Sequence, residues 1–63
     1  MKLLHIKFTH SVAYNSVEKP FFSVAEQPQV KVEILKDCIK LTDRTHTIIV
    51  PMSLVAYIVY DKE

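Results

Sequence analysis

Hydrophobic and polar residues alternate along much of the chain with the period of two that is typical of β-strands. The first segment shows the pattern most clearly, because its polar positions are His5, Lys7, Thr9 and Ser11. The apolar side of the same pattern is formed by Leu4, Ile6, Phe8, Val12 and Tyr14. We therefore predict a half-buried strand over Leu3–Thr9 that continues beyond a bend near His10.

Two further alternating runs predict a β-hairpin. Val30–Leu35 alternates apolar residues with Lys31 and Glu33, and Cys38–Thr42 alternates them with Lys40. The polar pair Lys36-Asp37 separates the runs, which is the spacing of a two-residue turn. A third run, 45–50, follows the polar break at Asp43-Arg44 and adds another predicted strand.

The last predicted strand, Val55–Tyr60, differs from the others because both of its faces are apolar. Val55, Tyr57 and Val59 lie on one face, and the alternate residues Ala56, Ile58 and Tyr60 lie on the other. A strand with one face in water would alternate with polar residues, so this one is expected to be central or covered by something. The apolar stretch 48–60 is shorter than the ~20 residues of a membrane-spanning helix, and Pro51 interrupts it.

The segment Asn15–Gln29 is predicted to be an irregular loop, because Pro20 and Pro28 bracket its apolar residues. Ser23 is placed to begin a single helical turn over Val24–Gln27. The chain contains no glycine, so glycine-rich phosphate loops are excluded. Turns that need a positive φ are expected at Asn15, Asp37 or Asp43, the residue types that best tolerate it.

Together these elements predict a single all-β domain over 1–63, with about five antiparallel strands in a small barrel or curled sheet. The sequence VPMSLV, Val50–Val55, resembles the end of an SH3-like barrel, where a proline opens a 3₁₀ turn and a valine enters the last strand. Pro51 and Val55 match those positions, whereas Leu54 stands where SH3 domains usually carry tyrosine. The chain has no tryptophan, so the resemblance implies the topology and not recognition of proline-rich peptides.

The chain as a whole also looks like the short, glycine-poor β proteins that phages encode to bind host enzymes. This likeness implies a regulator or inhibitor that works in the host cytoplasm. The lone Cys38 and the absence of a recognisable signal peptide agree with a reducing, cytoplasmic setting. A net charge of +1 is too balanced for the strongly basic face that nucleic-acid binding usually requires.

Candidate catalytic chemistry is sparse. His5 and His10 differ in parity, and on a straight strand they point to opposite faces, so surface histidines are a better interpretation than metal ligands. Cys38 with a histidine is a conceivable nucleophilic pair, but a chain of 63 residues leaves little volume for a substrate cleft. The carboxylates are spread among lysines as on a solvated surface. We therefore expect no enzyme activity, no cofactor and no metal.

Apolar surface remains as the candidate functional feature, because such patches on small proteins mark protein contacts. The candidate partner-binding residues are Phe21, Phe22, Tyr57, Ile58 and Tyr60. The alternative interpretation for Phe21 and Phe22 is that they close one end of the core. A second hypothesis is a single-stranded nucleic-acid surface formed by Lys7, Lys31 and Lys40, although along the chain no stacking aromatics interleave with these lysines. Self-association is a further possibility, since a core this small is marginally stable.

Overall fold

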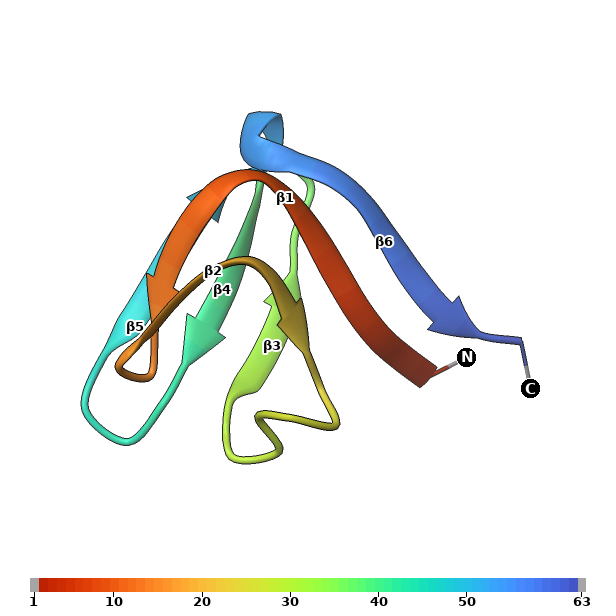
Figure 1. Cartoon of the computed structure of the whole chain (residues 1–63). Coiled ribbons are helices and arrows are strands. Elements are labelled where there is room, and N and C mark those ends of the chain that lie inside the picture. Colours follow the sequence, from red (N-terminus) through yellow and green to blue (C-terminus); the bar gives the residue numbers. More distant parts are fainter. Residues whose placement is uncertain (1, 63) are drawn as a thin grey trace.

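The computed structural model describes residues 2–62 and is all-β within that range (Figure 1). Its elements are β1 (Lys2–Tyr14), β2 (Val17–Ser23), β3 (Lys31–Ile34), β4 (Cys38–Thr42), β5 (Thr47–Pro51), the 3₁₀ turn η1 (Met52–Leu54) and β6 (Val55–Asp61). The strands form two antiparallel three-stranded sheets. Sheet A has the order β2-β1-β6 and sheet B the order β3-β4-β5. No helix within residues 2–62 is long and apolar enough to cross a membrane.

The predicted all-β fold class is confirmed, and of its two predicted forms, a small barrel or a curled sheet, the structure has the curled sheet. There are six strands in the described part of the chain, one more than the five predicted. The extra strand is β2, which occupies the segment predicted to be an irregular loop. Pro20 is compatible with this strand because β2 lies at the sheet margin, where a proline leaves no ladder donor missing.

The β1 strand organises sheet A, because it pairs with β6 along its first half and with β2 along most of its length. Figure 1 shows β1 as an arch, which is the predicted bend near His10. The bend coincides with an irregularity in the β1–β2 pairing, where the partner of Lys7 is Phe21 and the next paired residue is Val12, opposite Lys19. Pro20 falls inside this interruption.

A second irregularity corrects the prediction for the start of the chain. The pairing of β1 with β6 shifts register between Leu3 and His5, so Leu4 is an extra residue there. Leu4 was expected on the core side with Ile6, but it is 42% exposed, and Leu3 packs against the core instead. An inserted residue reverses the faces of the residues beyond it, which period-two counting does not detect.

The predicted hairpin is present, and the predicted turns are present in part. β3 and β4 form the predicted hairpin, with Glu33 opposite Lys40. The single turn after Ser23 is present, since the Gln27 amide donates to the Ser23 carbonyl at 3.0 Å. A positive φ occurs at Asn15, as predicted, and also at Ser16, which was not expected. Asp37 and Asp43 do not adopt one.

The turn between β5 and β6 has the local geometry expected from the VPMSLV segment. Pro51 is extended, η1 covers Met52–Leu54, and the Val55 amide donates back to the Met52 carbonyl. The Met52 amide donates to the Asp37 carbonyl at 2.9 Å, which ties this turn to the β3–β4 hairpin. η1 carries the chain from sheet B to sheet A, so that β6 begins beside β1.

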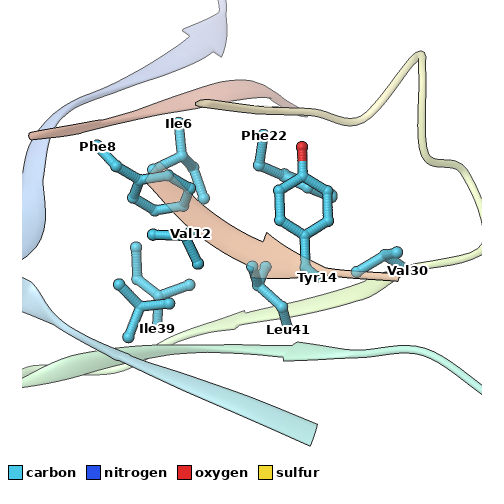
Figure 2. Close-up of a cluster of buried hydrophobic side chains, with 9 residues drawn as sticks. Ile6, Phe8, Val12, Tyr14, Phe22, Val30, Ile39 and Leu41 are labelled. Carbon is cyan, nitrogen blue, oxygen red and sulfur yellow. The ribbon is translucent and has the colours of Figure 1, made fainter. Parts of the chain in front are cut away.

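The core lies between the two sheets and is fully apolar apart from the tyrosine hydroxyl. Figure 2 shows side chains of sheet A facing side chains of sheet B across this layer. The buried residues are Ile6, Phe8, Val12, Tyr14 and Phe22 from sheet A, Ile39, Leu41 and Val50 from sheet B, and Val30 from the connection before β3. Both sheets therefore depend on each other for burial.

Tyr14 is the one core residue with a polar end. Its hydroxyl donates to the Phe21 carbonyl at 2.7 Å, and its ring meets the Phe22 ring edge-on at 5.3 Å between centroids. Burial raises the pKa of the Tyr14 hydroxyl, and the negative charge of Glu26 raises it further. The neutral hydroxyl is therefore the form that the folded chain requires.

This shift predicts a loss of stability in base. The unfolded chain ionises Tyr14 near its ordinary pKa of about 10, while the folded chain holds the proton to higher pH. The stability due to the neutral hydroxyl is therefore present below about pH 10 and is lost as pH rises through the folded pKa. Urea midpoints measured from pH 8 upward should fall above about pH 10 in the wild type and fall less in Tyr14→Phe. Tyr57→Phe, at an exposed position, serves as the control and should keep the wild-type slope.

Candidate interaction surface

The outer face of sheet A carries aromatic side chains next to a lysine. Lys7 of β1 lies directly opposite Phe21 of β2 on one side and opposite Tyr57 of β6 on the other. Residues that face each other across antiparallel strands project to the same side of the sheet. Phe21, Lys7 and Tyr57 therefore form a row across all three strands.

The neighbouring row extends this surface. His5 lies opposite Ser23 in β2 and opposite Val59 in β6. The His5 ring meets the Tyr57 ring edge-on, with 6.3 Å between the centroids. We call the surface formed by His5, Lys7, Phe21, Tyr57 and Val59 the aromatic face.

Charges border the aromatic face at its β2 side. The Lys19 ammonium lies 5.4 Å from the centre of the Phe21 ring and forms an exposed ion pair with Glu26 at 3.5 Å. An exposed pair of this kind adds little stability, but it holds a cation over the ring. Tyr57 at the opposite side is 55% exposed. The surface thus offers the Phe21 ring between Lys19 and Lys7, and the Tyr57 ring on the other side of Lys7.

The predicted partner-binding residues divide into three groups in the structure. Phe21 and Tyr57 belong to the aromatic face. Phe22 is fully buried in the core, and Ile58 lies opposite Ile6 and packs against the core, so neither presents its side chain on that face. Tyr60 is 42% exposed, but it lies opposite Leu3 on the other side of β6. Adjacent residues of a strand point to opposite faces, which separates Phe21 from Phe22.

The three lysines of the nucleic-acid hypothesis do not come together. Lys31 and Lys40 lie in sheet B, where Lys40 faces Glu33, whereas Lys7 lies in sheet A. Sequence reasoning also missed that aromatics flank Lys7, because they come from neighbouring strands rather than from β1 itself. Predicting these neighbours of Lys7 requires the order of the strands in the sheet, and the alternation within one strand does not give that order.

The other chemically notable residues do not assemble a site. Within residues 2–62, no group of three histidine, cysteine or acidic side chains is arranged to hold a metal ion. His10 and His46 each contact a neighbouring threonine hydroxyl, and Cys38 is half-buried where the β3–β4 hairpin begins its second strand.

The β4–β5 turn is stabilised by an aspartate. The Asp43 carboxylate accepts hydrogen bonds from the backbone amides of His46 and Thr45 at 2.7 and 2.8 Å, which lowers the pKa of that carboxyl. A hollow of about 360 Å³ separates this turn from the β1–β2 turn at Asn15 and Ser16. The Tyr14 hydroxyl is buried and bonded to the Phe21 carbonyl, the other polar side chains are partly or fully exposed to solvent, and those of Asp43 and Thr45 are engaged in the turn itself. We therefore assign it no ligand.

Comparison of the chain with protein-family models, curated proteins and solved structures found no match. The case for a function therefore depends on the geometry of the aromatic face and of the strands that build it.

Proposed function

We propose that this chain is a small protein–protein interaction module that acts by binding, without catalysis. The single observation that supports the proposal is the row Phe21–Lys7–Tyr57 on the outer face of sheet A. Rigid aromatic rings at an accessible surface provide contact area at low cost in side-chain entropy, and they are enriched in protein interfaces. A lysine between them favours a partner with a carboxylate at the matching position.

The proposed role is that of a regulator or inhibitor of a larger host enzyme in the cytoplasm, as phage-encoded proteins of this size act. A protein this small has room for one such surface and gains its effect by covering part of a larger partner. The aromatic face is composed of residues from three strands, so it is held by the sheet and needs little reordering on binding.

The test is affinity capture from a lysate of the source cell with matched variants. Tyr57→Ser removes the most exposed ring of the aromatic face and should abolish retention of the partner. Ile49→Ser is the control, because Ile49 is 59% exposed but lies in sheet B. A protein retained by the wild type and Ile49→Ser but not by Tyr57→Ser is the expected result. If no protein distinguishes the two variants, the aromatic face is not the binding surface.

One observation favours a second candidate, a surface for single-stranded nucleic acid. Sheets that bind such strands stack bases on exposed aromatics and contact phosphates with neighbouring lysines, and Lys7 lies between two rings. Affinity for a mixed-sequence oligonucleotide should then fall steeply with salt and should depend on Lys7 but not on Lys40. Equal effects of Lys7→Ala and Lys40→Ala, or affinity that is independent of salt, would exclude this candidate.

A further inference from the structure

The β6 strand is an open sheet edge, and after the irregularity at Ala56 it lacks the features by which proteins usually protect such edges. It pairs with β1 on one side only, and Figure 1 shows it at the rim of the molecule. Edges are normally protected by lysine, proline or short length. The other marginal strands in the described chain have these features: β2 contains Lys19 and Pro20, β3 has only four residues, and β5 ends at Pro51. Val55–Tyr60 contains no charge and no proline.

The direction of the β6 backbone groups follows from one hydrogen bond in β1. The Val24 amide donates to the Leu4 carbonyl at 3.0 Å, so the backbone of Leu4 faces the β2 side. Backbone groups of successive residues face opposite neighbours, so those of His5 and Lys7 face β6, and their partners Val59 and Tyr57 face β1. Ile58 and Tyr60 therefore direct their amides and carbonyls to the open edge. Unpaired backbone amides and carbonyls at a sheet edge can form hydrogen bonds with an additional strand.

The residue pattern of β6 indicates what that added strand is. When two copies of one strand pair antiparallel, residues whose backbone groups point to the open edge must lie opposite each other. The two-fold axis therefore passes through a residue position and not midway between two residues. If the axis passes through Val59, only Tyr57–Asp61 take part in the pairing between the two copies. Ala56, the extra residue where β6 shifts register against β1, then lies outside the paired segment. Ile58 then forms its ladder bonds with Tyr60 of the second copy.

The side chains of this register are mutually compatible. Val59 meets its own counterpart on the outer face, and Ile58 meets Tyr60 on the inner face, so these three apolar side chains meet apolar ones. Asp61 of one copy falls opposite Tyr57 of the other. A shift to a centre at Tyr60 would instead place Lys62 opposite Ile58 and Asp61 opposite Val59, which costs desolvation of two charges.

We propose that two copies of this chain associate through antiparallel pairing of their β6 strands, centred on Val59. The product is a continuous six-stranded sheet, β2-β1-β6 followed by β6-β1-β2 of the second copy. Because opposite residues project to the same side, both aromatic faces lie on one surface of this sheet. The dimer does not depend on the proposed function, since it uses the edge of β6, whereas partner binding uses the face.

The first test is a matched pair of charge variants at Tyr57, read as mass in solution by sedimentation equilibrium. The wild type should have twice the mass of the chain. In Tyr57→Glu, the new carboxylate of each copy faces Asp61 of the other copy, so the dimer dissociation constant should rise at least about tenfold. In Tyr57→Lys the same contacts become attractive, and the constant should stay within about threefold of the wild type. Glutamate at this position also lies beside Lys7 of its own chain, which preserves the fold, as circular dichroism would verify.

The second test fixes the register by disulfide formation in a Cys38→Ser background. Val59→Cys should give a covalent dimer on mild oxidation, because opposed residues at a non-hydrogen-bonded pair lie about 4.5 Å apart between Cα atoms. Tyr57→Cys is the control and should not form a covalent dimer. In the proposed register its two cysteines are offset by four residues along the strands, which is about 13 Å. A monomeric wild type, even one that captures another protein, overturns the proposal. So does a dimer that Tyr57→Glu leaves intact, or a disulfide in the Tyr57→Cys control but not in Val59→Cys.

Discussion

Replacing Phe22 by alanine is expected to remove a large part of the stability of the protein. Phe22 is fully buried, it pairs with Ile6, and its ring packs edge-on against Tyr14. Removing a buried phenylalanine ring costs about 3–5 kcal/mol. A chain of 63 residues has a total stability on the order of 3–9 kcal/mol, so this one change removes between about a third and all of it. Urea unfolding followed by circular dichroism measures the loss directly.

The neighbouring phenylalanine provides the control for that experiment. Phe21 projects to the other face of β2 and is partly exposed beneath the Lys19 ammonium. Phe21→Ala should cost only about 1 kcal/mol of stability and should weaken binding of the partner to the aromatic face. If the two alanine variants are equally unstable, the assignment of Phe22 to the core and Phe21 to the surface is wrong.

Ile39→Ala is expected to have the second largest effect. Ile39 is fully buried in β4, where it lies between Ile34 of β3 and Val50 of β5. It is one of the residues through which sheet B packs into the core. Truncation of a buried isoleucine costs about 2–5 kcal/mol, because the cavity that remains is only partly filled by relaxation. The midpoint of thermal unfolding should fall accordingly by at least about 8 °C, at roughly 4–8 °C per kcal/mol for a domain of this size.

Ile49→Ala is the matched substitution at an exposed position of the adjacent strand. The Ile49 side chain lies opposite Lys40 on the outer side of sheet B. Its loss should cost less than about 1 kcal/mol, mainly through the lower β propensity of alanine. A large loss at Ile49 with a small loss at Ile39 would mean that sheet B buries the other face.

Period-two alternation was sufficient to predict the hairpin of β3 and β4, the third strand of sheet B and most of the core positions. It failed where the regular geometry is interrupted. Leu4 was assigned to the core because an inserted residue leaves no trace in composition, and β2 was missed because Pro20 was read as a break. In the structure the same proline sits at a sheet margin, opposite the bend of β1.

The candidate site was less accessible to sequence reasoning than the fold. The exposed rings Phe21 and Tyr57 were identified as candidates, but their relation to Lys7 depends on strand order, which no single strand encodes. The last strand was expected to be central or covered because both of its faces are apolar. The structure shows that β6 is not central, which leaves its open edge as the feature that needs an explanation.

The pairing of the first strand with the last has a consequence for synthesis of the protein in the cell. Lys2 lies opposite Asp61, so sheet A joins two strands that are far apart along the described chain. The β1–β2 and β3–β4 hairpins contain only local contacts and are able to form early, whereas the pairing of β1 with β6 has to wait for β6. Tyr57 and Val59 belong to that last strand, so a nascent or truncated chain has no aromatic face. Binding activity on this surface therefore appears only after β6 has been synthesised and has paired with β1.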